Sequence, residues 1–196
     1  MRMFAGTRGV VVVAVLCLAA VPVAAQTTII SNLDGNDGTQ SANLNDQRNK
    51  AMGFTMPAGQ DYFLDHVTLR LDTAGAGTTP IVELWTDAGG QLGTFVETLT
   101  NPTFTTPGIV NYDFASSGAT LTAGAGYWIL AYGPAGAPGY DWKASLPPVN
   151  PTGIAAHLGA LYDSNGPPPT SNSTIICSYS VTATEVPVEL QTFTIE

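Results

Sequence analysis

Two aromatic residues in one short segment could form a platform for a sugar ring. Tyr140 and Trp142 are separated by one residue, so their rings lie on the same face if the segment is a strand. Aromatic rings stack on the apolar faces of sugars, Asp141 and Lys143 could supply polar contacts, and Tyr162 could add a third ring. The alternative is that Trp142 covers the open end of a hydrophobic core, because aromatic side chains supply much of the buried area.

A cluster of acidic and amide residues near the N-terminal end could hold a structural calcium ion. Asp34, Asn36 and Asp37 carry the carboxylate and amide oxygens that Ca²⁺ prefers. The cluster departs from the EF-hand pattern, because Gly38 and Thr39 stand where an Asx ligand and the turn glycine belong. Segments rich in Asp, Asn and Gly also form plain turns, which is the second hypothesis for these residues.

The sequence lacks the motifs of common hydrolytic enzymes. His66 and His157 are far apart and there is no H-E-x-x-H, so no metal-ligand spacing is present. There is also no G-x-S-x-G motif. Any two of the 15 acidic residues could pair as in a glycosidase, but the sequence selects none of them. We therefore expect a protein that is not an enzyme, and a glycoside-active enzyme is the least favoured function.

The first 25 residues have the features of a Sec-type signal peptide. Arg2 and Arg8 precede an apolar run over residues 10–20, and small residues up to Ala25 predict cleavage after that position. Pro22 interrupts the apolar stretch, which is shorter than the roughly 20 residues that span a bilayer. We therefore expect a secreted or cell-surface protein with no integral membrane span after cleavage.

Removal of this leader changes the charge and the cysteine count. Four basic residues then stand against 15 acidic ones, a net charge of −11. Such an acidic chain is a poor partner for nucleic acid or anionic membranes, because little in it could neutralise phosphates. Extracellular polysaccharide or cell-surface components are the expected partners. Cys17 leaves with the leader, so Cys177 has no partner for an internal disulfide and is expected to be a small buried residue.

Composition and periodicity predict an all-β fold. Only 11% of the 196 residues are charged, while Gly (21) and Pro (14) are abundant, as in domains with many turns. Apolar patterns predict about nine strands in one antiparallel two-sheet β-sandwich, jelly-roll-like, over residues 26–184: 28–31, 50–56, 62–73, 81–86, 95–100, 109–114, 127–132, 140–144 and 174–183. The prolines of residues 146–174 argue against a central strand there.

The uncharged strand predicted over residues 127–132 is expected to lie at the centre of the core. It follows a turn that contains Gly124 and Gly126, and its aromatic and β-branched residues favour burial on both faces. Trp85 and Trp128 are also expected in the core.

Several motifs recur in a known order and spacing along residues 28–145. They are SNL (residues 31–33), GFT (53–55), LDHVTLRLD (64–72), VELWTDAGGQLGTFVETL (82–99), VNYDF (110–114), LTAGAGYWIL (121–130) and the late Trp142. Together they resemble the bacterial exported family called choice-of-anchor R domain proteins. The resemblance implies a β-sandwich on proteins that reach the cell surface through varied C-terminal anchors, and it implies no catalytic residues.

The C-terminal tail, residues 185–196, departs from that family. It has neither an apolar helix with a basic tip nor an LPxTG motif, and it ends in a PVEL-x-x-F-like segment. This tail could be a last strand, a loose end or a recognition signal. An exposed strand over residues 28–32 or 188–195 could also add to a neighbour's sheet and form an oligomer. The sequence thus favours a non-catalytic surface or matrix module, with a carbohydrate-binding module using Tyr140 and Trp142 as the alternative.

Overall fold

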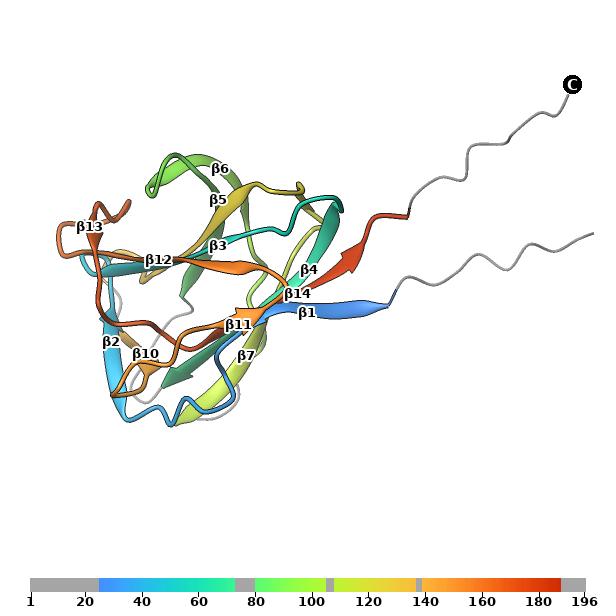
Figure 1. The fold of residues 1–196 in the computed structure, drawn as a ribbon. Coiled ribbons are helices and arrows are strands. Elements are labelled where there is room, and N and C mark those ends of the chain that lie inside the picture. Colours follow the sequence, from blue (N-terminus) through green and yellow to red (C-terminus); the bar gives the residue numbers. More distant parts are fainter. Residues whose placement is uncertain (1–24, 73–79, 105–107, 137–138, 188–196) are drawn as a thin grey trace, which may run out of the picture.

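The computed structural model describes residues 25–72, 80–104, 108–136 and 139–187. Residues 1–24 of the predicted leader and residues 188–196 of the tail lie outside these ranges. Ala25, the last residue of the predicted leader, is the first residue described. The described chain folds into two antiparallel sheets of eight and six strands, without helices (Figure 1). The expected all-β sandwich is confirmed. No helix in the described ranges is long and apolar enough to cross a membrane.

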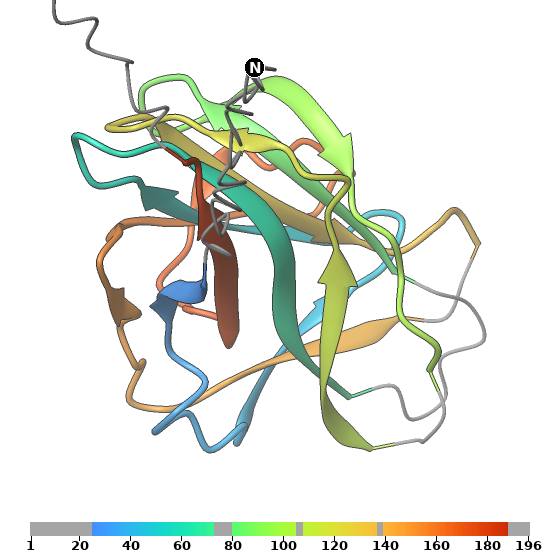
Figure 2. The ribbon, with the colours of Figure 1, turned by 90° about the vertical axis from the view of Figure 1, so that its right-hand side faces the viewer.

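The larger sheet is built around the longest strand, β4 (Tyr62–Asp72). Its main order is β11-β1-β14-β4-β10-β2, and β7 and β8 also pair with β4. Figure 2 shows β14 between β1 and β4. The bounds are β1 Gln26–Ser31, β2 Gln40–Leu44, β7 Ile109–Ala115, β8 Thr120–Leu121, β10 Tyr140–Ala144, β11 Thr152–Gly153 and β14 Tyr179–Glu185.

The smaller sheet has the order β13-β12-β3-β9-β5-β6. Its strands are β3 Asn49–Thr55, β5 Ile81–Asp87, β6 Leu92–Thr98, β9 Gly126–Tyr132, β12 Ala156–Asp163 and β13 Ser171–Asn172. The strand β9 lies between β3 and β5, and its residues from Tyr127 to Ala131 are all buried. The expectation of a core strand buried on both faces is confirmed.

The two faces of β9 belong to different hydrophobic clusters. Ile129 packs in the main core between the sheets, whereas Trp128 and Leu130 belong to a second cluster on the opposite face of the six-stranded sheet. Gly53 makes room there, because a Cβ at this position would lie 2.8 Å from the indole ring of Trp128. Trp128 is therefore buried as expected, but outside the main core.

The structure contains 14 strands in its described part, more than the nine expected. The segment between the first two predicted strands contains β2, and the proline-rich region 146–174 contains β12. The expectation that this region has no inner strand is wrong, because β12 lies between β13 and β3. The physical reason is that Pro151 and Pro167 flank β12 without interrupting its hydrogen bonds.

The N-terminal strand is covered along most of the segment proposed for strand addition. Ile30 and Ser31 pair with β11, the amide of Ala155 donates to the carbonyl of Ile29, and the other edge of β1 pairs with β14. An added strand would have to displace β11 from residues 29–31. The other segment suggested for assembly, 188–195, lies outside the described residues.

Candidate functional site

The aromatic platform predicted from Tyr140 and Trp142 is not on the surface. These side chains are 1% and 0% exposed, because both pack in the main hydrophobic core. Their strand β10 lies inside the larger sheet, between β2 and β4. The indole Nε1 of Trp142 donates to the carbonyl of Ser178 at 2.8 Å, which satisfies its only polar atom inside the core. The prediction that these two rings bind sugar is therefore wrong, and Trp142 has the alternative role of a core residue.

The residues proposed for calcium form local turns. Oδ1 of Asn36 accepts a hydrogen bond from the amide of Gly38 at 3.1 Å. Oδ1 of Asp37 accepts from the amide and the hydroxyl of Thr39, at 3.0 and 2.8 Å, and these bonds lower the pKa of Asp37. Asp34 is exposed. These are the contacts of Asx turns, the plainer of the two hypotheses for this segment.

The side chain of Arg70 forms hydrogen bonds with the backbone of the segment proposed for calcium. The guanidinium of Arg70 donates to the carbonyl of Leu33 at 3.1 Å and to the carbonyl of Asn36. Backbone carbonyls are typical calcium ligands, so the arginine takes two oxygens that an ion would need. Within the described ranges, no group of three or more His, Cys, Asp or Glu could hold a metal. Calcium binding was one of two hypotheses for this segment, and the melting experiment in the Discussion distinguishes them.

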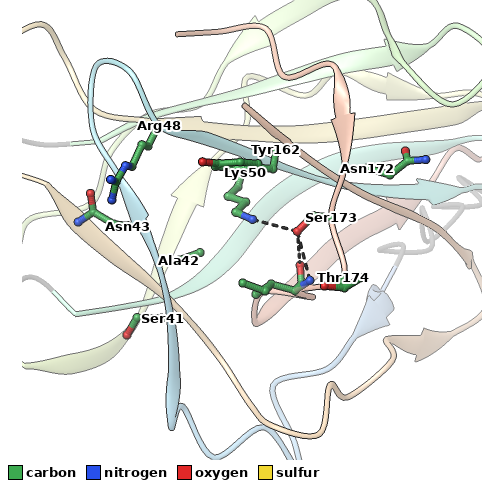
Figure 3. Close-up of a pocket in the computed structure, with 10 residues that line it drawn as sticks. Ser41, Ala42, Asn43, Arg48, Lys50, Tyr162, Asn172, Ser173 and Thr174 are labelled. Carbon is green, nitrogen blue, oxygen red and sulfur yellow. Dashed lines mark hydrogen bonds between the residues drawn. The ribbon is translucent and has the colours of Figure 1, made fainter. Parts of the chain in front are cut away.

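The third predicted residue, Tyr162, lies in a pocket between the two sheets (Figure 3). This pocket, called the end pocket below, has a volume of about 370 Å³. It lies at one end of the sandwich, where β2 of the larger sheet faces β3, β12 and β13 of the smaller one. Its lining consists of Ser41, Ala42, Asn43, Arg48, Lys50, Tyr162, Asn172, Ser173, Thr174 and Ile175.

Strand pairing places the central residues of the end pocket. Lys50 and Tyr162 are direct partners in the β3–β12 ladder, so both side chains lie on the same face. Ser173 follows β13, and its amide donates to the carbonyl of Ala160 at 2.8 Å, which brings its side chain to that face too. Arg48 lies in the turn between β2 and β3. Its backbone amide donates to Oδ1 of Asn45, the first residue after β2, at 2.7 Å.

The ammonium group of Lys50 is the most unusual feature of the end pocket. The side chain is only 5% exposed. Its Nζ lies 4.3 Å from the ring centre of Tyr162 and donates to Oγ of Ser173 at 2.9 Å. Burial lowers the pKa of Lys50, and the nearby Cys177 opposes this shift. Burial also raises the pKa of the fully buried Cys177 to about 12, and Lys50 opposes this rise, so the thiol is inert, as expected for a small core residue.

The contact between Lys50 and Ser173 has the composition of a serine–lysine catalytic pair, but its hydrogen bonding gives it another role. Oγ of Ser173 also accepts from the amide of Ile175 at 3.2 Å, and it donates to the carbonyl of Ile175 at 3.4 Å. Both lone pairs and the proton of the hydroxyl are therefore engaged. Ser173 positions the ammonium of Lys50 and is poorly arranged to act as a nucleophile.

The two histidines do not come together. His66 lies on β4 of one sheet and His157 on β12 of the other, and neither lines the end pocket. Burial lowers the pKa of His157.

Sequence reasoning found Tyr162 but missed Lys50, Arg48 and Ser173. A signal for Lys50 was present, because in the strand it has the same parity as the buried Met52 and Phe54. A lysine at an inward position is rare unless it has a partner. Ser173 gave no such signal, since only the fold brings it to Lys50.

Comparison of the chain with models of protein families, with curated proteins and with solved structures finds no match.

Proposed function

We propose that this chain is an exported, non-catalytic β-sandwich module that binds extracellular polysaccharide at the end pocket. The observation that carries the proposal is the lining of this pocket. It combines the half-buried ring of Tyr162 with hydroxyl and amide side chains, namely Ser41, Asn43, Asn172, Ser173 and Thr174. Sugars present apolar ring faces and many hydroxyl groups, which such a lining complements.

The pocket supports binding better than catalysis. No Asp, Glu, His or Cys lines it, so it lacks the two carboxylates that glycoside hydrolysis requires. Its volume of about 370 Å³ falls in the range of small-molecule sites. A ligand held there would be one or a few sugar units of a longer chain.

The position of the pocket suits a protein attached by one end. The chain enters at β1 and leaves at β14, which are neighbours, and the pocket lies at the other end of the sandwich near β2 and β13 (Figure 1). The signal peptide features and the resemblance to choice-of-anchor R domain proteins support an exported surface module. The sandwich then acts as a spacer that presents the pocket away from the tail.

A glycan array followed by calorimetric titration tests this proposal. The protein purified after export should bind at least one class of extracellular saccharide, and Tyr162→Ala should weaken that binding about tenfold or more, as expected for the loss of a stacking aromatic ring. The matched control is Tyr132→Ala, which removes a half-buried tyrosine from the same sheet outside the pocket. No binding to any saccharide, or equal losses in both variants, would contradict the proposal.

A further inference from the structure

We propose that the saccharide in the end pocket carries a carboxylate, as in a uronic acid, and that Lys50 and Arg48 bind this group. The inference rests on the proposed function and specifies its ligand. It follows from the charges of the pocket lining, which among the described residues includes Arg48 and Lys50 and no Asp or Glu.

The first observation is the incomplete coordination of Lys50. An ammonium group has three N–H donors. One donates to Ser173 Oγ at 2.9 Å, and the ring of Tyr162 lies 4.3 Å from the nitrogen, so one donor has no protein partner among the described residues. A charge that is 95% buried is costly unless it is paired. A bound carboxylate would supply both the missing acceptor and the missing charge.

The second observation is a second cation in the same pocket. Arg48 precedes Lys50 by two residues, and its exposed guanidinium has no hydrogen bond or ion pair within the described part of the chain. Figure 3 shows Arg48 beside Asn43 on one side of the pocket and Lys50 reaching toward Ser173 on the other. Arg48 and Lys50 thus line one cavity without an acidic residue in its lining, a composition that suits an oxyanion.

The third observation is the distribution of charge over the whole chain. Only four basic residues follow the predicted leader, and they oppose 15 acidic ones. Two of the four line the end pocket, and a third, Lys143, donates to Oγ of Ser41 at 2.6 Å, which lines it too. An acidic protein that gathers its few cations around one cavity has a local site for anions and repels them elsewhere. Short acidic oligosaccharides should therefore bind better than long polyanions.

A comparison of matched oligosaccharides tests the inference. The probes are an oligogalacturonate, the same oligosaccharide with its carboxyl groups methyl-esterified, and a sulfated oligosaccharide of equal length, titrated into the protein purified after export. The uronate should bind at least about tenfold more tightly than its ester, because a charge-assisted hydrogen bond is lost on esterification. Lys50→Met should remove this preference, and Lys50→Arg should restore part of it.

The exposed Arg48 offers a variant that does not disturb the core. Arg48→Gln should reduce uronate affinity about tenfold with an unchanged melting temperature, whereas Arg70→Gln, which removes a cation outside the pocket, should leave the preference for the acid unchanged. Equal affinity for acid and ester would overturn the inference while the proposed function stands. Preference for the sulfated probe would overturn the assignment of a carboxylate. Failure of all three probes and of every neutral saccharide would overturn both proposals.

Discussion

Lys50 is a charged residue at a position where strand alternation places apolar side chains. Its neighbours of equal parity, Met52 and Phe54, are fully buried in the main core. Burial lowers the pKa of Lys50 below its ordinary value of 10.5, because the charged ammonium loses hydration in the fold. The residue therefore opposes folding at neutral pH, which is the usual compromise between stability and function at a binding site.

The pH dependence of stability follows from this shift. A folded-state pKa below the unfolded value means that the penalty is fully present at low pH and disappears as pH rises toward 10.5. The titratable groups next to the ammonium are Tyr162, whose ring centre lies 4.3 Å from Nζ, and Cys177, whose pKa is raised to about 12, while Arg48 lines the same pocket. The stability of the native protein should rise between pH 7 and pH 10 relative to that of Lys50→Met.

Urea denaturation of both proteins at several pH values measures this difference. The denaturation midpoint of Lys50→Met at pH 7 should equal or exceed that of the native protein, because replacing a buried ion by an apolar residue of similar length is often neutral or stabilising. A difference that is constant with pH would contradict a charged, desolvated Lys50. Arg48→Met, at an exposed position, is the control.

Trp142 should contribute to the stability of the fold and not to ligand binding. It is fully buried and holds the carbonyl of Ser178, so Trp142→Ala should lower the free energy of unfolding by about 3–5 kcal/mol. Phe95→Ala is the control, since Phe95 is 46% exposed and its loss should cost much less. Chemical denaturation gives both values. A small effect of Trp142→Ala on stability would show that the ring is not in the core.

Arg70 gives a corresponding test for the turn segment that contains Asp34, Asn36 and Asp37. Because its guanidinium holds the carbonyls of Leu33 and Asn36, Arg70→Gln should destabilise the protein by about 1–3 kcal/mol. Calcium should leave the melting temperature of the native protein unchanged, since a ligand raises it only by binding the folded state. A rise on adding calcium that EDTA reverses would instead support a calcium site at Asp34, Asn36 and Asp37.

At the scale of elements, close approach of neighbouring strands restricts two glycines. A Cβ at Gly53 would lie 2.8 Å from the Trp128 ring, and a Cβ at Gly153 would lie 2.2 Å from the carbonyl oxygen of Ile29. Gly53→Ala should destabilise the protein by about 1–3 kcal/mol through overpacking. Gly153→Ala should separate β11 from β1, which hydrogen exchange at residues 29–31 would report. Gly59→Ala is a poor control for these variants, because the positive φ of Gly59 strains any other residue even though the space around it is open. Ala58→Gly, a change at an exposed position of the same turn, is the better control.

Most strands could be predicted from the sequence because their apolar residues alternate or run continuously. The sequences of β4, β7 and β9 have this pattern, and the structure confirms the three predicted strands. The polar β2 was missed, because its pairing with β10 and not its own sequence makes it a strand. The same limit explains the error over Tyr140 and Trp142. Alternation showed that they share a face, but only the packing of the folded chain determines that this face is the core.

The site was less predictable than the fold, for a related reason. The end pocket combines β2 with residues 172–175, which lie about 130 positions away in the sequence. Tyr162 could be recognised by its residue type, and Lys50 by its parity in a strand. No local pattern connects Ser41 or Asn43 with Ser173, since long-range pairing of both sheets brings them to one cavity.

At the scale of the whole molecule, the pairing of β1 with β14 has a mechanical consequence. Gln26 is the partner of Thr184, so the two ends of the described sandwich lie side by side. Tension between the two termini would open this pair one hydrogen bond at a time. Tension between the tail and a ligand in the end pocket would load β14 along its length, in shear against both β1 and β4. A surface module held by its tail and pulled through its ligand should therefore resist a larger force than the same domain pulled by its two ends, which optical tweezers can compare.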